Sequence, residues 1–400
     1  MSAKVFLYLP DGEFFKFPPS NDPSTLAAPS SAPVYIPTKI YQAALDIRVP
    51  ITIACVYAAL VTLLNSYNKT NGYKPWGISK SKAFFVFVVI HNVLLALYSG
   101  WTFAGMLRAM TTIFANPLNS SGLAGTVDSL CKLHGPSGLG NAVTYNPLQS
   151  QWTSTSPNVI DVQTATNTDL GRLWNEGLAF YGWFFYLSKF YEVLDTLIIL
   201  AKGKKSSILQ TYHHAGAMMC MWAGIRYMSP PIWMFVFVNS FIHTLMYTYY
   251  TLTAFAVPVP MALKRSLTTI QIAQFLVGST YAAIHSFVGY TIPISVPVTE
   301  TVKAAVVPTA TGVSSSLAAL ATAAGLGDLL NKVWGQQVFG TEQHQNNTVT
   351  RWETVYQDVP CIDTSGQTFA IWLNVLYLAP LTALFVRFFV KSYLKHARNM

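Results

Sequence analysis

Two adjacent histidines, His213 and His214, lie inside the apolar stretch 206–226. An ionisable group is costly at membrane depth and normally faces a protein interior or a water-filled cavity. Imidazole can act there as a general base or as a nucleophile. The pair therefore predicts a buried functional site rather than a lipid-facing surface.

Three further polar clusters occur in neighbouring apolar stretches: KFYEVLDT at 189–196, NSFIHTLMYTYY at 239–250 and TTIQIAQF at 268–275. Within each cluster the polar residues recur mainly at intervals of three or four, which places them on one face of a helix. We expect these faces and the histidine pair to line a common pocket.

The elements that must position these residues are membrane helices. Of the 400 residues, 52% are hydrophobic and only 10% are charged, whereas about a quarter of a soluble protein is charged. Stretches of about 20 apolar residues cross a bilayer as a helix. The predicted fold is an all-α integral membrane protein with seven transmembrane helices, at 47–66, 83–106, 178–201, 206–226, 231–254, 266–290 and 369–390.

The positive charges set the expected orientation. Every second connection is basic, as at Lys202, Lys204 and Lys205, and basic connections tend to stay in the cytosol. The N-terminus is then lumenal, the C-terminus is cytosolic, and all four polar clusters lie in the cytosolic half of the membrane. The net charge is +9, but the basic residues are spread over short clusters between apolar stretches. They therefore do not indicate a nucleic-acid partner. An uncharged stretch at 304–327 is an alternative eighth span, but it would move the basic tail across the membrane.

The expected domain organisation follows from these spans. It comprises a Pro/Ser-rich lumenal segment 1–46, a seven-helix domain 47–390 with lumenal loops 107–177 and 291–368, and a basic tail 391–400.

The two lumenal loops contain candidate modification sites. Each holds one cysteine, Cys131 or Cys361, and a disulfide between them suits an oxidising lumen. Asn119 and Asn346 begin glycosylation sequons on the same side, whereas the sequon at Asn68 is expected in the cytosol and unmodified.

Paired membrane histidines are also typical of di-iron oxygenases, the desaturases and hydroxylases that hold their irons with several histidine boxes. The chain has eight histidines, of which His134, His344 and His396 fall in loops or the tail. His91 and His285 are isolated and are expected to make interhelical hydrogen bonds. The metal site therefore lacks ligands, although a di-iron desaturase or hydroxylase remains the alternative. A retinal receptor would need a lysine in the last span, and 369–386 has none.

The four clusters together resemble the signatures of the ELO-type very-long-chain fatty acid elongases, the membrane 3-ketoacyl-CoA synthases. Those signatures are K-x-x-E-x-x-D-T, H-x-x-H-H, N-x-x-x-H-x-x-M-Y and T-x-x-Q-x-x-Q-F. The matching residues are Lys189, Glu192, Asp195 and Thr196; His213 and His214; Asn239, His243, Met246 and Tyr247; and Thr268, Gln271, Gln274 and Phe275. Gln210 replaces the first histidine of its box, as in elongases of polyunsaturated and some fungal acyl chains. The resemblance covers the seven spans and not the N-terminal segment or 291–368.

The resemblance implies condensation of a fatty acyl-CoA with malonyl-CoA to a 3-ketoacyl-CoA two carbons longer, with release of CO2 and CoA. It implies helices that enclose a narrow acyl-CoA tunnel in the endoplasmic reticulum membrane, without a cofactor or metal. The expected partners are acyl-CoA, malonyl-CoA, the lipid bilayer, and the reductases and dehydratase of the elongation cycle.

The resemblance also suggests roles for individual residues. No cysteine is well placed to carry the acyl group, so a histidine is the candidate for that role. His213 is the expected nucleophile or base, with His214 and His243 assisting. The other expected catalytic groups are Asn239 and Gln271 as amide donors and Lys189, Glu192 and Asp195, which fix protonation states. The expected substrate-binding residues are Gln210, Met246, Tyr247, Tyr250 and Gln274, together with Lys204, Lys205, Lys264 and Arg265 for the CoA phosphates. The positive-inside pattern would equally explain these last four.

Overall fold

The computed structural model describes residues 3–20, 28–29, 32–118, 121–134, 143–146, 149, 151–154, 170–302 and 347–394. The sequons at Asn119 and Asn346, the alternative span 304–327 and residues 395–400 lie outside these ranges. The chain divides into two units, residues 1–293 with 356–400 and residues 294–355. All predicted catalytic residues belong to the first unit.

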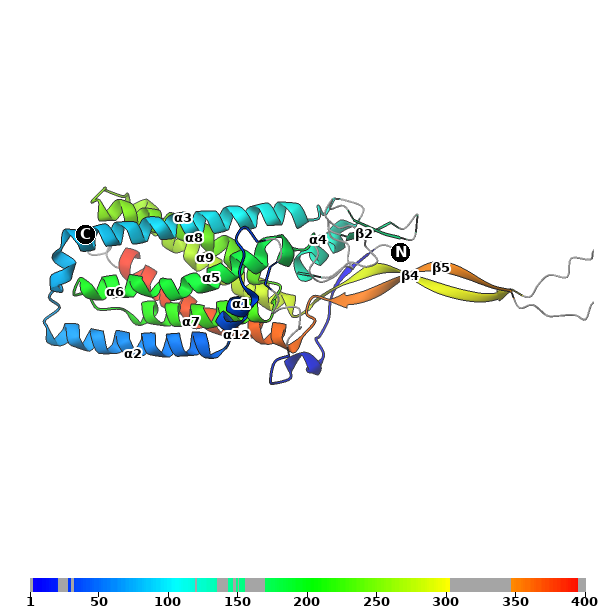
Figure 1. Ribbon diagram of the computed structural model, residues 1–400, viewed down its shortest axis with the longest axis horizontal. Helices are drawn as coiled ribbons and strands as arrows, with labels where there is room; N and C mark the ends of the chain where they lie inside the picture. Colours follow the sequence, from blue (N-terminus) through cyan, green and yellow to red (C-terminus); the bar gives the residue numbers. More distant parts are fainter. Residues whose placement is uncertain are drawn as a thin grey trace, which may run out of the picture. The chain divides into compact units, whose positions relative to one another are not determined.

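Long helices dominate the first unit (Figure 1). They are α2 (Arg48–Thr70), α3 (Lys82–Ile113), α5 (Ala179–Tyr191), α6 (Val193–Ala201), α7 (Ile208–Arg226), α8 (Ile232–Ala254), α9 (Met261–His285) and α12 (Ser365–Phe389). Each predicted span coincides with one of these helices, except that the third is divided between α5 and α6. Among the described residues, four helices are long and apolar enough to cross a membrane: α2, α3, α9, and α12 with its extension to Leu394. The chain is thus a mainly helical membrane protein.

Local sequence signals explain where several helices begin. The side chains of Ser81, Ser207 and Thr364 accept hydrogen bonds from backbone N–H groups in the first turns of α3, α7 and α12. Such N-caps satisfy donors that have no partner within the helix. Outward-facing apolar side chains then cover α2 and α3, where Val56, Leu63 and Leu97 are each more than 60% exposed. Exposed apolar surface of this kind suits contact with lipid.

The sheet is the main departure from the predicted architecture. The region 291–368 was expected to be a loop, but its described parts belong largely to β4 (Val288–Val302) and β5 (Asn347–Pro360). The residues of β4, VGYTIPISVPVTETV, are rich in β-branched side chains, which favour strands. The bounds predicted for the sixth span, 266–290, are wrong at both ends. Helix α9 begins before residue 266 and ends at His285, and β4 begins three residues after that. The second unit holds residues 294–302 of β4 and 347–355 of β5.

The N-terminal segment contributes to the same sheet. Strand β1 (Val5–Leu7) pairs antiparallel with β4, with Val5 opposite Tyr290 and Phe6 opposite Gly289, and the strand order is β1-β4-β5. A 3-10 turn, η1 (Gly12–Phe15), and a short helix, α1 (Thr38–Ala44), follow. The buried ring of Tyr41 in α1 stacks on Trp183 of α5, with the ring centroids 5.4 Å apart. Part of segment 1–46 therefore packs on the helical bundle.

Smaller elements complete the first unit. These are η3 (Gly77–Lys80), α4 (Gly122–Cys131), β2 (Val143–Asn146), β3 (Gln151–Ser154), η4 (Trp174–Leu178) and η6 (Val390–Leu394). Cys131, the last residue of α4, forms a disulfide with Cys361, which lies between β5 and α12. Asp128 of α4 is buried nearby, paired with Arg172 at 2.7 Å and accepting a hydrogen bond from Tyr290 at 2.7 Å.

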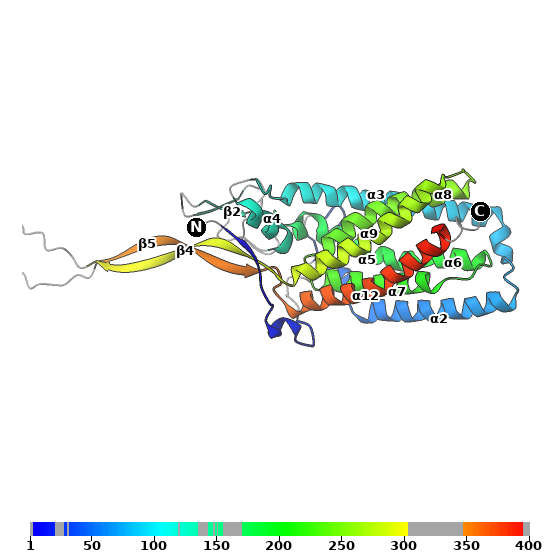
Figure 2. The same cartoon turned by 180° about the vertical axis from the view of Figure 1, so that it is seen from behind.

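The helices form a closed arrangement around the candidate site (Figures 1 and 2). Helix α5 contacts α7 and α8, α12 contacts α7 and α9, and α8 contacts α9, so these helices form a ring. Helix α3 packs along α8, while α2 packs against α6 and α7. The ring brings part of each polar cluster to one interior, namely Lys189, His213, Asn239 and Gln274.

Candidate active site

A narrow cavity lies inside this ring of helices. The space inside it that the centre of a water molecule can reach is about 40 Å³. The polar lining residues are Lys189, His213, Asn239, Gln274, Asn374 and Tyr377, and the apolar ones are Phe185, Ala217, Met221, Phe235, Phe275, Leu378 and Leu381. The cavity therefore combines groups able to do chemistry with an apolar wall.

A buried lysine is at the centre of the polar part. Lys189 Nζ donates to Glu192 Oε1 at 2.7 Å and to Asn239 Oδ1 at 3.4 Å, and it lies 4.0 Å from the centroid of the Phe185 ring. Lys189 and Glu192 are only 3% and 2% exposed. Their i, i+3 spacing lets the pair form although the helix breaks at Glu192, between α5 and α6.

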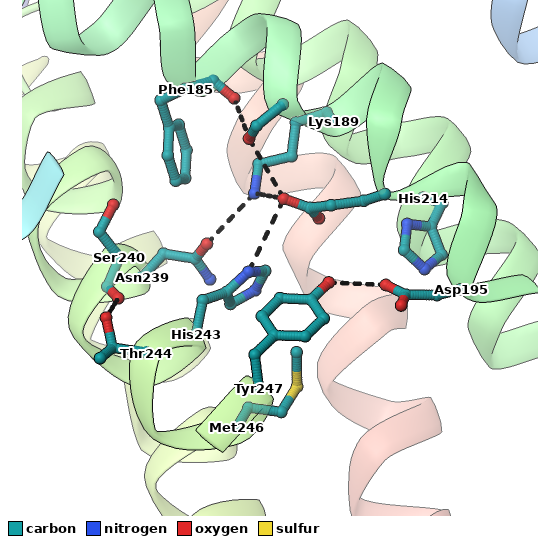
Figure 3. A network of polar contacts seen from close by, with 12 residues as sticks. Phe185, Lys189, Asp195, His214, Asn239, Ser240, His243, Thr244, Met246 and Tyr247 are labelled. Atoms are coloured by element: carbon teal, nitrogen blue, oxygen red, sulfur yellow. Dashed lines mark hydrogen bonds and ion pairs between the residues drawn. The ribbon is translucent and has the colours of Figure 1, made fainter. Parts of the chain in front are cut away.

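Helix α8 presents a row of polar side chains to this pair. Figure 3 shows Asn239, His243 and Tyr247 pointing from α8 towards Lys189 and Asp195. His243 Nδ1 lies 3.7 Å from Glu192 Oε1, which is an electrostatic contact longer than a normal hydrogen bond. The imidazole of His243 and the ammonium of Lys189 thus approach the same carboxylate oxygen.

Asp195 joins three helices beside this network. Its Oδ2 accepts a hydrogen bond from the Tyr247 hydroxyl at 2.6 Å, and its Oδ1 lies 2.9 Å from His91 Nε2. His91 of α3 therefore makes the interhelical contact expected of it. His285 does not, since its Nδ1 lies 2.9 Å from the Tyr281 carbonyl oxygen of its own helix. Neither Asp195 nor Tyr247 lines the cavity.

The adjacent histidines diverge. Neighbouring residues on an α-helix point about 100° apart, because one turn takes 3.6 residues. His213 lines the cavity, whereas His214 Nε2 lies 2.8 Å from Gln210 Nε2 and its ring meets Tyr57 edge to face. Gln210 also reaches Thr196 of α6 at 3.5 Å. The structure therefore brings His213, and not His214 or Gln210, into the cavity.

The two glutamines of α9 differ in the same way. Asn239 Nδ2 donates to Gln274 Oε1 at 3.5 Å, and both residues line the cavity. Gln271 lies about one helical turn earlier, roughly 4.5 Å along the axis, and its amide contacts the sulfur of Met246 at 3.5 Å. The geometry thus favours Gln274 over Gln271 as the amide partner of Asn239.

The predicted phosphate-binding residues lie outside the cavity. Lys204 and Lys205 are exposed in the connection between α6 and α7, and Lys264 and Arg265 lie in the first two turns of α9. Tyr250 is also outside it and packs edge to face against Tyr247. These basic residues flank the end of the bundle at which α7 begins, the same end that is nearer to His213.

Sequence reasoning missed the contribution of α12. Asn374 and Tyr377 line the cavity, and the Tyr377 hydroxyl lies 3.0 Å from His213 Nδ1. The signal was present, since Asn374, Tyr377, Leu378 and Leu381 follow the i, i+3, i+4, i+7 pattern of one helical face. Because this face carries no histidine or charge, it was not recognised.

The comparison of the chain with known families finds the family whose signatures the four polar clusters resemble. The family model described as ELO, the GNS1/SUR4 family, matches residues 42–400. The chain belongs to the GNS1/SUR4 family.

Individual relatives of this GNS1/SUR4 chain carry elongase names. It is 38% identical over 103 residues to "Fatty acid elongase sre1" of Dictyostelium discoideum, which is 26% of the chain and 38% of the relative. It is 35% identical over 105 residues to "Very long chain fatty acid elongase 3" of Homo sapiens, covering 26% and 39%. It is 37% identical over 107 residues to "Very long chain fatty acid elongase 4" of Mus musculus, covering 26% and 34%. The aligned parts thus span well under half of each relative.

The alternative of a di-iron oxygenase receives no support from the GNS1/SUR4 family match or from the geometry. Within the described ranges, no group of three or more His, Cys, Asp and Glu side chains lies close enough to hold a metal ion. His344 and His396 lie outside those ranges. The expectation that the protein needs no cofactor stays a prediction.

Proposed function

We propose that the protein is a fatty acid elongase, which condenses a long-chain fatty acyl-CoA with malonyl-CoA. The products are a 3-ketoacyl-CoA two carbons longer, CO2 and CoA. The observation that carries this proposal is the position of His213 on a cavity that also holds the Lys189–Asn239–Gln274 network and continues between apolar side chains.

The polarity of the cavity changes in the same direction along three helices. In α7 the lining runs from His213 through Ala217 to Met221, in α5 from Lys189 to Phe185, and in α8 from Asn239 to Phe235. Each polar residue lies nearer the end where α6 joins α7, and a step of four residues is about 6 Å. This arrangement suits a thioester at the polar end and an acyl chain directed into the apolar part.

His213 acts on the acyl group through its unprotonated ring nitrogen. In a covalent route, this nitrogen attacks the thioester carbonyl carbon and the carbon–sulfur bond breaks. The departing CoA thiolate takes up a proton from solvent. Malonyl-CoA then loses CO2, and the electron pair of the broken bond forms an enolate that attacks the acyl carbon and releases His213. In a direct route, the enolate attacks the thioester carbon itself and the carbon–sulfur bond breaks. The CoA thiolate then takes up a solvent proton that His213 Nε2 accepts and passes on.

Lys189 and Asn239 act on the negative charge that develops at the carbonyl oxygens. Lys189 provides an ammonium group, and Asn239 provides an amide whose bond to Gln274 is long at 3.5 Å. Preorganised donors of this kind stabilise charge in a water-poor site and often account for a large part of catalysis. Glu192 holds the ammonium in place, and His243 lies 3.7 Å from the same carboxylate oxygen. Lys204, Lys205, Lys264 and Arg265 attract the CoA phosphates at the cavity's polar end.

In the proposed topology, seven helices span the endoplasmic reticulum membrane. The N-terminus lies in the lumen and the C-terminus in the cytosol. Reductases and a dehydratase then act on the 3-keto product. Sequon mapping tests the orientation: new sequons in the exposed turn 71–75 should stay unmodified, while Asn119 and Asn346 should lose glycans on amidase treatment. Asn68 is uninformative because its buried amide bonds to the Leu200 carbonyl oxygen at 2.8 Å. A glycan in the turn 71–75 would reverse the orientation.

The activity is tested in microsomes with radiolabelled malonyl-CoA and a panel of acyl-CoAs. The wild-type chain should convert malonyl-CoA to labelled 3-ketoacyl product without consuming oxygen. His213→Gln should abolish the product at unchanged protein level, whereas His285→Gln, which alters a buried histidine outside the cavity, should retain it. Hydroxylamine trapping of an acyl-enzyme separates the covalent route from the direct one. Failure of the wild type with every acyl-CoA, or full activity of His213→Gln, would overturn the proposal.

A further inference from the structure

Tyr377 of α12 contacts His213 at two atoms. Its hydroxyl oxygen lies 3.0 Å from His213 Nδ1 and 2.9 Å from the backbone carbonyl oxygen of His213. Both distances are normal for hydrogen bonds. A phenol has one proton to donate, so the two contacts constrain each other.

The shared hydroxyl determines which nitrogen of His213 carries the proton. The carbonyl oxygen can only accept, so the Tyr377 proton must point to it; otherwise two oxygens would face each other at 2.9 Å with no hydrogen between them. The Tyr377 oxygen is then an acceptor towards Nδ1, which must donate. Neutral imidazole has a single N–H group. His213 is therefore in the Nδ1–H tautomer, and Nε2 keeps its lone pair.

The Nε2 atom of His213 is left without a protein partner among the described residues. His213 lines the cavity, and within the described part of the chain no hydrogen-bond partner occupies Nε2. The rings of Phe275 and Phe385 flank the imidazole, with centroids 6.3 and 6.2 Å away. The unprotonated nitrogen is thus the one available to a substrate.

The position of Tyr377 is itself held tightly. Its ring stacks on Tyr212 with centroids 5.5 Å apart, and the Tyr212 hydroxyl donates to the Tyr377 carbonyl oxygen at 3.2 Å. The ring also lies directly against Gly216, where an added Cβ would collide with it. Only glycine at position 216 leaves room for this placement of the ring.

We propose that Tyr377 is a positioning residue, which holds His213 as the Nδ1–H tautomer with Nε2 directed into the cavity. This inference rests on the proposed function for its kinetic consequence, but the tautomer itself can be measured without any turnover. The Tyr377 hydroxyl also fixes the rotation of the His213 imidazole, because it bonds to both the ring and the backbone carbonyl oxygen of His213.

The kinetic experiment compares Tyr377→Phe with Tyr212→Phe in the full-length protein. Each variant removes one hydroxyl from the same stacked pair. The Tyr377 hydroxyl contacts His213, whereas the Tyr212 hydroxyl donates to the Tyr377 carbonyl oxygen. Tyr377→Phe should lower kcat about 10- to 100-fold, by analogy with the loss of a group that orients a metal-ligating histidine, with KM for acyl-CoA nearly unchanged. Tyr212→Phe should stay close to wild type. Equal kcat values for the two variants would overturn the proposal.

The spectroscopic experiment uses 15N-labelled histidine in the detergent-solubilised protein. The His213 signals are assigned by their loss in His213→Gln, and wild-type His213 should show a protonated Nδ1 and an unprotonated Nε2. Tyr377→Phe removes the hydroxyl, and Gly216→Ala displaces the Tyr377 ring. Both variants should shift His213 towards a mixture of the two tautomers. A wild-type Nε2–H tautomer would overturn the inference even if a variant fails to fold. Full activity of His213→Gln would instead refute the proposed function and leave the tautomer standing.

Discussion

Lys189 and Glu192 form a buried ion pair across the break between α5 and α6, with Nζ 2.7 Å from Oε1. The same carboxylate oxygen accepts a hydrogen bond from the Ser188 hydroxyl at 3.2 Å and lies 3.7 Å from His243 Nδ1. A buried charge is tolerated only when it is paired and hydrogen-bonded. The pair therefore ties the helix break to α8 and holds an ammonium group at the cavity.

Removing one partner of this pair should be more harmful than removing both. Lys189→Met should lower the free energy of unfolding by about 3–5 kcal/mol, because it leaves the Glu192 carboxylate buried and unpaired. The double variant Lys189→Met/Glu192→Leu should recover most of that loss but remain inactive, since the ammonium group is still missing. Thermal unfolding in detergent and malonyl-CoA turnover measure the two effects. A double variant as unstable as the single one would contradict this account.

The chain length accepted by the cavity should depend on Met221. This residue lines the apolar part, two helical steps of four residues beyond His213. Met221→Trp should disfavour the longest acyl-CoAs by about tenfold or more, because each methylene that no longer fits is worth about 10-fold or more in specificity. Met221→Ala should extend the accepted length. Product distributions across an acyl-CoA series give the preference for long over short chains. Ile208→Ala, at an exposed position, is the control. An unchanged distribution in both variants would show that the acyl chain does not enter here.

The disulfide should contribute to stability and not to turnover. Cys131 and Cys361 are 230 residues apart in sequence, and neither lines the cavity. Cys131→Ser/Cys361→Ser should lower the free energy of unfolding by about 2–5 kcal/mol, mainly because the unfolded chain gains freedom. Condensation at low temperature should persist. Exposed Cys55→Ser serves as the matched control. Thermal unfolding that is unaffected by dithiothreitol in the wild type would argue against the bond.

Alkaline stability should depend on Tyr290, outside the membrane helices. Burial and the Asp128 carboxylate raise the pKa of Tyr290 well above its usual value of 10.0, and Arg172 opposes this only in part. Above about pH 10 the unfolded chain loses this proton while the folded chain retains it, so stability falls as pH rises. Tyr290→Phe should weaken this dependence in melting curves at about pH 9 and 11. At neutral pH it should cost about 1–3 kcal/mol through the lost hydrogen bond. An identical pH slope in both proteins would refute the assignment.

Much of the helical framework could be predicted from local sequence. The long apolar stretches anticipated the helices, since apolar length and N-caps are local properties. The break at Glu192 and the strands β4 and β5 were not anticipated. At Glu192 the Asp195 N–H donates to the carbonyl oxygen three residues back, at 3.1 Å, so the turn tightens there. The strands need partners that are distant in sequence, because Val5 of β1 pairs with Tyr290 of β4.

By itself the sequence determined which side chains share a face of each helix, and it brought Lys189, His213 and Asn239 forward as candidates. Periodicity follows from 3.6 residues per turn and needs no knowledge of the neighbouring helices. The rotation of each helix about its axis depends on how its ridges pack into those of its neighbours. Only the tertiary structure therefore separated His213 from His214, placed Gln274 rather than Gln271 beside Asn239, and supplied Tyr377 from the last helix.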